Sequence, residues 1–294
     1  MFKSGYAAVI GRPNVGKSTL VNQILGQKVV IATPKPQTTR KRIKGIYTDE
    51  NVQIVFLDTP GITKPIDKLG EFLLDESTCT IPESDVILFV VDVSEPAGKG
   101  DRWIAKNLLV TKIPIIIVLN KVDKIKNPLK KEENILSYKT LFETNLPTVK
   151  ISAKTGRNVD TLIKNITRKL PEGELIYAED EVTDENMRSI AKEIIREQIL
   201  LNTQDELPHS VAVVIDSYEE KENIDNILAT IYVETESQKG IMIGKKASML
   251  KTISTAARLE LEKIADKKIY LNIQVKVQKK WRQNKNIVKD WVGS

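Results

Sequence analysis

The chain of 294 residues lacks several features that mark whole classes of protein. Its single cysteine, Cys79, allows neither a disulfide framework nor a thiolate metal cluster, as is usual in a reducing cytoplasm. The apolar runs VILFVV and IPIIIVL are far shorter than the roughly 20 residues that cross a bilayer. We expect no signal peptide, because the first apolar run, YAAVI, leads directly into a predicted functional loop. These absences predict a soluble, cytoplasmic protein.

Positive charge is concentrated near the C-terminus. Residues 239–294 carry fourteen Lys and Arg against four Asp and Glu, a balance of +10, which leaves −4 for residues 1–238 of the total of +6. A basic segment on a mildly acidic body suggests a polyanionic partner. A lysine-rich solvated surface is the alternative interpretation. Trp281 and Trp291 lie among these basic residues, where packing against the folded C-terminal part of the chain is favoured over base stacking.

The first 170 residues alternate short apolar runs with amphipathic stretches. YAAVI, VQIVFL, DVILFVVDV, IPIIIVL and PTVKIS are rich in β-branched residues, as expected of strands buried on both faces. Helical segments such as 17–25 and 159–169 separate them. This alternation predicts an α/β domain with a mixed, mostly parallel sheet covered on both sides.

A second, smaller α+β domain is predicted beyond an acidic segment that contains Pro and Gly. Its element order is α-β-β-α-α-β. We therefore expect a first domain over residues 1–172, a linker over 173–184, and a second domain with a basic tail over 185–294.

A phosphate-binding motif follows the first predicted strand. GRPNVGKS, residues 11–18, matches G-x-x-x-x-G-K-S and precedes a helix. Backbone N–H groups of such a loop cradle phosphates, Lys17 would reach the β- and γ-phosphates, and Ser18 would ligate Mg²⁺. The predicted nucleotide contacts here are Gly11, Arg12, Pro13, Asn14, Val15, Gly16, Lys17, Ser18 and Thr19.

Three further motifs, in order, predict a guanine nucleotide. DTPG would place the Asp58 carboxylate on the Mg²⁺ side and the Gly61 N–H beside the γ-phosphate. Asp123 of NKVD can accept two hydrogen bonds from guanine, a donor pair that adenine lacks, and N–H groups of ISA could meet guanine O6. An adenine-specific NTPase would leave NKVD unexplained. The predicted contacts are Asp58, Thr59, Pro60, Gly61, Asn120, Lys121, Val122, Asp123, Ile151, Ser152 and Ala153.

The loop PKPQTTRKR between the first two motifs contains two candidate metal ligands. Either Thr38 or Thr39 could bind Mg²⁺ while the γ-phosphate is present, and the sequence does not separate them. With Lys17 and Gly61, these threonines form the predicted catalytic set. Ile62 follows DTPG where many GTPases have a water-orienting Gln, so we expect slow intrinsic hydrolysis.

Asn14 has two interpretations of comparable weight. Its amide oxygen could coordinate a monovalent cation such as K⁺ that bridges the phosphates and supplies positive charge in the transition state. The alternative role is to cap the loop turn.

A second phosphate-binding loop is predicted in GIMIGKKASMLKTI, residues 240–253. It is similar to the I-G-x-x-G loop of a type II KH domain, which clamps about four single-stranded nucleotides through their backbone. The predicted RNA contacts are Ile243, Gly244, Lys245, Lys246, Ala247 and Lys251.

Together, these motifs and ELPHSVAVVI, SQKGIMIGK and VKVQKKWR resemble the bacterial Era GTPase family along essentially the whole chain. The resemblance implies a P-loop GTPase domain joined to a KH domain, GTP, GDP and Mg²⁺ as ligands, and hydrolysis of GTP to GDP and phosphate. It also implies binding to the 3′ end of 16S rRNA, a role in 30S subunit assembly, and peripheral association with the cytoplasmic face of the plasma membrane. We expect a monomer.

One residue departs from the family pattern. Ala247 stands where the family has the second glycine of the RNA loop, and its methyl group could obstruct a phosphate or disfavour a positive φ. We expect weakened but real RNA binding. The alternative is a GTPase that acts mainly at the membrane surface or through protein partners. An RNA-modifying enzyme lacks support, because no cofactor-binding domain or nucleophilic cysteine motif is visible.

Overall fold

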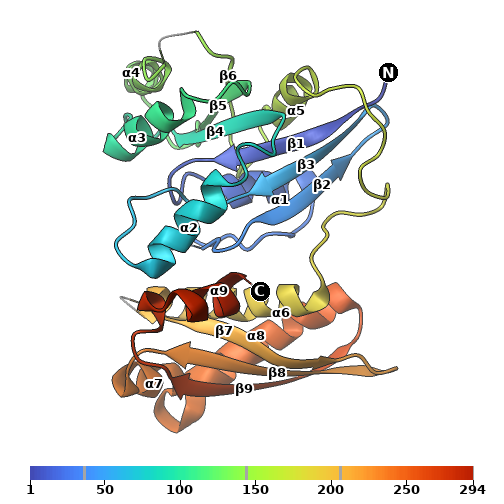
Figure 1. Cartoon of the computed structure of the whole chain (residues 1–294), viewed down its shortest axis with the longest axis vertical. Coiled ribbons are helices and arrows are strands. Elements are labelled where there is room, and N and C mark those ends of the chain that lie inside the picture. Colours follow the sequence, from blue (N-terminus) through green and yellow to red (C-terminus); the bar gives the residue numbers. More distant parts are fainter. Residues whose placement is uncertain (36–37, 143–144, 205–206, 294) are drawn as a thin grey trace. The chain divides into compact units, whose positions relative to one another are not determined.

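A computed structural model describes residues 1–35, 38–142, 145–204 and 207–293. Its elements alternate strand and helix in the first part of the chain and follow a different order in the second (Figure 1). The chain divides into two compact units, of which one comprises Met1–Ala32, Thr39–Lys64 and Leu73–Asp184. The other comprises Thr33–Thr38, Pro65–Phe72 and Glu185–Ser294. Pro36 and Gln37, in the predicted threonine loop, lie outside the described residues.

Within the described residues, the first unit is built on a six-stranded sheet in the order β2-β3-β1-β4-β5-β6, parallel except for β2. The strands are β1 Lys3–Ile10, β2 Ile43–Thr48, β3 Val52–Asp58, β4 Val86–Asp92, β5 Ile115–Asn120 and β6 Thr148–Lys150. The helices are α1 Lys17–Leu25, α3 Lys99–Leu108, α4 Pro128–Lys139 and α5 Val159–Thr167, and α2 Lys68–Thr78 belongs to this unit from Leu73 onward.

Alternate residues of each central strand pack into cores on opposite faces of the sheet. In β1, Ala7 and Val9 belong to the core that includes α1 and α5, whereas Ala8 and Ile10 belong to the core that includes α3 and α4. Because both faces are covered, the central strands are apolar throughout, as the sequence pattern indicated. The carboxyl ends of these strands carry the predicted nucleotide motifs.

The edge strand β2 was not identified from sequence. Its polar and apolar residues mix because it lies at the sheet edge, antiparallel to β3. The segment predicted as a linker attaches to this side of the first unit. The buried Gln53 side chain accepts from the N–H groups of Ile176 and Tyr177, and the Ile46 N–H donates to the Val182 carbonyl at 2.9 Å.

The described part of the second unit has a three-stranded sheet in the order β7-β8-β9, antiparallel between β7 and β8 and parallel between β8 and β9. Its principal elements are α6 Met187–Asn202, β7 Ala212–Glu219, β8 Ile224–Val233, α7 Glu236–Ile243, α8 Ser248–Ala265, β9 Lys268–Val277 and α9 Lys285–Gly293. Short 3-10 turns occupy Leu207–His209, Lys245–Ala247 and Trp281–Gln283.

Helix α9 forms the end of the segment predicted as a basic tail. Trp281 is fully buried and donates its Nε1–H to the Ser210 carbonyl at 2.9 Å, and Trp291 stacks on Tyr232. Both tryptophans therefore pack on the second unit. The predicted fold class, an α/β domain followed by a smaller α+β domain, is confirmed. Among the described helices, none combines the length and apolarity that crossing a bilayer requires.

Candidate functional site

The predicted phosphate loop connects β1 to α1 and has the backbone of a tight turn. Asn14 and Gly16 both have positive φ, 62° and 99°. A Cβ at Gly16 would lie 2.4 Å from the Asn120 amide nitrogen, and one at Gly11 would lie 2.3 Å from the Val90 carbonyl oxygen. The close approach of Asn120 to Gly16 and of Val90 to Gly11 leaves no room for a side chain at either position. At Gly16 the positive φ also favours glycine.

Lys17, the first residue of α1, points its ammonium group into the loop. Its Nζ donates to the carbonyls of Gly11 and Arg12 at 3.2 and 3.1 Å. Burial lowers the pKa of Lys17 to about 8, although the nearby Asp58 carboxylate acts in the opposite direction. The loop thus holds a desolvated cation that an incoming anion would stabilise.

Ser18, Thr39 and Asp58 meet at one point from three separate segments of the first unit. Asp58 Oδ2 accepts from Ser18 Oγ at 2.7 Å and from Thr39 Oγ1 at 3.2 Å, and the two hydroxyl oxygens are 3.0 Å apart. Asp58 is fully buried, and its Oδ1 has no hydrogen-bond partner among the described residues. Burial raises the pKa of Asp58, against the lowering effect of Lys17. A buried carboxylate oxygen without a partner, next to two hydroxyls, fits a Mg²⁺ ion.

This geometry distinguishes the two candidate threonines. The Thr38 hydroxyl donates to the Lys35 carbonyl at 2.6 Å and lies 2.7 Å from the Thr33 hydroxyl, so it stabilises its own loop. The Thr39 hydroxyl instead joins Ser18 and Asp58. The arrangement favours Thr39 as the metal ligand.

The DTPG segment approaches the phosphate loop closely. Thr59 is buried and donates its hydroxyl to the Val9 carbonyl, and a Cβ at Gly61 would lie 2.5 Å from the Pro13 nitrogen. Ile62 donates its N–H to the Gly11 carbonyl, and its side chain packs into the core shared with α3 and α4. The side chain that follows DTPG is therefore a core residue, which agrees with the expectation that it does not orient water.

Asn120 and Lys121, which belong to the predicted base-binding motif NKVD, form hydrogen bonds to the backbone of the phosphate loop. Asn120 Nδ2 donates to the Val15 carbonyl at 2.8 Å, and Lys121 Nζ donates to the Asn14 carbonyl and pairs with Asp92, each at 2.5 Å. Burial alone would raise the pKa of Asp92, but hydrogen bonds from Lys121 and Ser94 outweigh it and lower the pKa. Asp123 follows Asn120 and Lys121 closely in the chain and is exposed, so its carboxylate is accessible to a base.

The ISA segment already uses its backbone donors within the protein. The N–H groups of Ile151, Ser152 and Ala153 donate to Leu119 O, Arg157 O and Asn120 Oδ1, so each has an acceptor. Guanine O6 would have to share one of them. In this structure the segment supports Asn120, because Ala153 N–H holds the asparagine amide at 2.9 Å.

Sequence analysis did not identify the ion pairs that hold Arg12. Its Nε donates to the fully buried Asp101 at 2.8 Å, and its Nη2 donates to Glu95 at 2.7 Å. Arg12 was predicted as a nucleotide contact and that stays a prediction; its guanidinium pairs with Asp101 in the first turn of α3 and with Glu95 in the segment before α3. No local signal could have revealed this, since the partners are more than 80 residues away along the chain.

The predicted RNA loop in the second unit has an unusual backbone. Gly244 has φ 73°, and a Cβ there would lie 2.8 Å from Met249, so glycine is required. Lys246 and Ala247 are both left-handed, with φ 52° and 59°. Lys245, Lys246 and Ala247 are exposed between α7 and α8, as is Lys251, while Ile243 is half-buried. The positive φ that an alanine disfavours is therefore present at Ala247.

Comparison with known proteins gives consistent matches for both units. The family model described as 50S ribosome-binding GTPase matches residues 6–121, and the KH domain model matches residues 206–282. GTPase Era of Nostoc sp. is 50% identical over 285 residues, which are 97% of this chain and 87% of that protein.

Two crystal structures are 40% identical to this chain and cover 99% of both chains. One is Era in complex with MgGDPNP and nucleotides 1506–1542 of 16S ribosomal RNA, with a TM-score of 0.95. The other is a point variant of Aquifex aeolicus Era bound to GDP·AlF4⁻, with a TM-score of 0.94. With the motifs in place on both units and this identity over nearly the whole length, the chain belongs to the GTPase Era family.

Proposed function

We infer that the protein binds GTP with Mg²⁺, hydrolyses GTP to GDP and phosphate, binds the 3′ end of 16S rRNA and assists 30S subunit assembly. One observation carries the nucleotide part of this proposal. It is the meeting of Ser18, Thr39 and the buried Asp58, whose Oδ1 has no partner among the described residues, close enough to Lys17 for their charges to interact. Solved relatives contain MgGDPNP, GDP·AlF4⁻ and a 16S rRNA segment.

On the phosphate side, this chain supplies positive charge and oriented N–H groups. Lys17 would exchange the Gly11 and Arg12 carbonyls for phosphate oxygens, and the N–H groups at the start of α1 would face the phosphates. Ser18, Thr39 and Asp58 would hold Mg²⁺, which when bound neutralises charge on the β- and γ-phosphates. Burial makes these interactions stronger than they would be in water.

Hydrolysis is proposed to be slow without a partner. The Ile62 side chain is buried, so the attacking water must be positioned by the backbone around Gly61, by a cation or by a bound partner. Asn14, exposed in the loop, is proposed to offer its amide oxygen to K⁺. Stimulation of hydrolysis by K⁺ but not by Na⁺, lost in Asn14→Ala, would support that role, and equal rates in both salts would exclude it.

Base selection is proposed to rest on Asp123. Asn120 and Ala153 hold the preceding turn, and the exposed carboxylate can accept from guanine N1–H and the exocyclic amine. Asp123→Asn should weaken GTP binding by roughly 100-fold or more and favour xanthosine triphosphate. Titration with fluorescent nucleotides measures this change, with ATP as the control ligand. Unchanged GTP affinity would overturn the assignment.

RNA binding is proposed for the loop between α7 and α8. Lys245 and Lys246 are exposed next to Gly244, where they can neutralise backbone phosphates. The left-handed Ala247 supports the second candidate as well, a loop too strained to clamp RNA in a protein that acts at the membrane or through protein partners. RNA titration of the wild-type protein separates the two.

The remaining assignments are also proposals. We assign the GTPase domain to residues 1–172, the connecting segment to 173–184 and the KH domain to 185–294, and propose a monomer in the cytoplasm. Peripheral association with the inner face of the plasma membrane is supported by the balance of +10 over residues 239–294. Vesicle flotation with and without anionic lipid tests the association, and sedimentation tests the monomer.

A further inference from the structure

The sheet of the second unit has one face that α6 and α8 do not cover. Along β8, Ile227, Ala229 and Ile231 are buried, whereas Asn226 and Leu228, which alternate with them and so lie on the opposite face of the sheet, are partly exposed. The outward side chains of all three strands form one surface, which we call the outer face.

The outer face can be divided along the strands into two ends and a middle. At one end and in the middle, the side chains contact other residues of the same unit. At one end Trp291 of α9 stacks on Tyr232, with ring centroids 3.9 Å apart and planes 20° from parallel. In the middle, Thr230 donates to Asp216 at 2.7 Å and accepts from Gln274 at 3.0 Å. Polar and aromatic groups in these zones therefore have partners.

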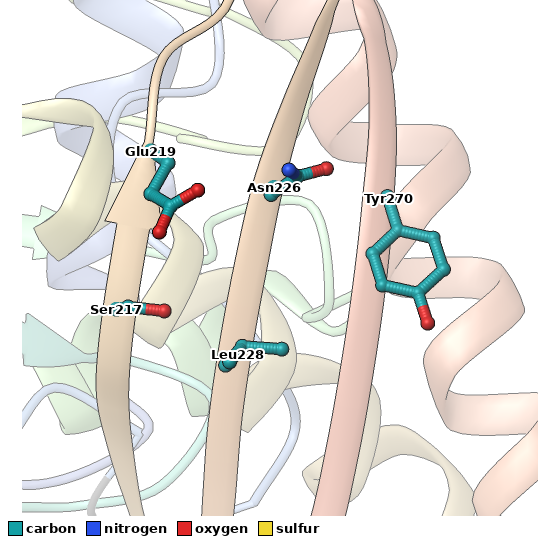
Figure 2. A pocket seen from close by; sticks show the side chains of 5 residues that line it. All are labelled: Ser217, Glu219, Asn226, Leu228 and Tyr270. Atoms are coloured by element: carbon teal, nitrogen blue, oxygen red, sulfur yellow. The ribbon is translucent and has the colours of Figure 1, made fainter.

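The other end is an open hollow of about 380 Å³ lined by Ser217, Glu219, Asn226, Leu228 and Tyr270 (Figure 2). The register places Glu219, Asn226 and Tyr270 in one row across β7, β8 and β9. Figure 2 shows Ser217 and Glu219 directed toward β8, and Asn226 and Leu228 directed toward the Tyr270 ring.

The side chains in this hollow are available for a ligand. Tyr270 is 53% exposed and Leu228 is 41% exposed. The hydroxyls of Ser217 and Tyr270 and the amide of Asn226 make no hydrogen bond with any residue that the structure describes. Glu219 has a loose ion pair with Lys221 at 3.5 Å. An exposed ring, an apolar floor and free hydrogen-bonding groups thus occur together.

We propose that this hollow binds one unstacked base of single-stranded RNA, outside the loop between α7 and α8. The base stacks on Tyr270 and covers Leu228, while Asn226 and Glu219 hydrogen-bond its edge. The Glu219 carboxylate only accepts hydrogen bonds, so the edge it contacts carries N–H donors. Lys268, exposed two residues before Tyr270 on the same face, neutralises a neighbouring phosphate.

A nucleic acid base suits the hollow better than a protein side chain does. A flat base satisfies the exposed ring and the row of polar side chains at the same time. The proposal rests on the RNA binding proposed above, because it extends the same RNA past the loop clamp.

The test uses the full chain and two RNAs. One is the four-nucleotide length that a KH loop clamps, and the other is the segment equivalent to nucleotides 1506–1542 of 16S rRNA. Tyr270→Ala removes the ring, and Tyr270→Phe is the matched control that keeps it. Fluorescence anisotropy gives the affinities, and thermal melting shows that both variants fold.

Tyr270→Ala should weaken binding of the long RNA by about 5- to 150-fold, the range for loss of one base–aromatic stack. Tyr270→Phe should change it less than about twofold, and the four-nucleotide RNA should bind all three proteins equally. Photocrosslinking of a 5-iodouridine-substituted long RNA should map to Tyr270. These results would support the proposal.

Three outcomes would overturn it. If Tyr270→Ala binds the long RNA as the wild type does, the hollow is not an RNA site, although the RNA-binding loop stands. If Tyr270→Ala weakens both RNAs equally, the effect is not that of a separate base site. If the wild type binds neither RNA, both this proposal and the proposed RNA binding fail.

Discussion

Replacing Ala247 by glycine tests how the RNA loop is built. Ala247 has φ 59° and ψ 24°, and it precedes α8. A left-handed conformation costs a non-glycine residue about 1–2 kcal/mol, whereas glycine adopts it freely. Glycine also gains entropy in the unfolded chain, which offsets about 0.5–1 kcal/mol of that relief. Ala247→Gly should therefore stabilise the second unit by roughly 0.5–1 kcal/mol.

Thermal melting is the assay, with Ala256→Gly as the matched control. Ala256 lies inside α8, where glycine costs about 1 kcal/mol. One substitution type should thus shift the two melting temperatures in opposite directions, by roughly 2–4 °C each. Removing the methyl group should also raise RNA affinity, because a phosphate can then approach the loop backbone more closely. If Ala247→Gly destabilised the protein as Ala256→Gly does, the left-handed assignment would be refuted.

Three further substitutions test the nucleotide site. Thr39→Val should weaken Mg²⁺-dependent binding of a GTP analogue by roughly tenfold or more, whereas Thr38→Val should not. Equal losses for the two variants in Mg²⁺ titrations would contradict the assignment of Thr39 as the metal ligand. Ile62→Gln should cost about 1–3 kcal/mol in stability without speeding hydrolysis, because the amide would be buried; faster hydrolysis at an unchanged melting temperature would show that this side chain reaches the site. Arg12→Ala should leave the buried Asp101 without its ion-pair partner and lower the free energy of unfolding by about 1–3 kcal/mol. The double variant Arg12→Ala/Asp101→Ala should recover part of this loss. No recovery in calorimetry would mean that the two residues do not act as a pair.

Much of the fold was predictable because the sequence carries two strong signals, namely continuous apolar runs at the central strands and a phosphate-binding motif between the first strand and the first helix. The central strands β1, β3, β4 and β5 are apolar throughout since both faces are buried, and the phosphate motif identifies the turn that follows the first of them. The edge strand β2 lacks that signal because only part of it is covered. Helix α9 was missed because its charged residues obscured the apolar positions Val288 and Val292, which are buried.

The candidate site was predictable where a motif keeps its residues within a few positions of one another. Lys17, Ser18 and Asp58 belong to such motifs. The choice between Thr38 and Thr39 depends on the path of a loop, and the burial of Ile62 depends on α3 and α4, so neither follows from spacing. The pairing of Arg12 with Asp101 likewise exists only once α3 lies beside the phosphate loop.

The most direct test of the whole account is the affinity of the full-length protein for the segment equivalent to nucleotides 1506–1542 of 16S rRNA, measured with a non-hydrolysable GTP analogue and with GDP. The account predicts saturable binding, with a higher affinity in the presence of the GTP analogue than in the presence of GDP. The affinity should fall when Lys245 and Lys246 are replaced by Glu. It should not fall in the control Lys263→Glu, which lies at the far end of α8. Failure to bind this RNA in either nucleotide state would contradict it.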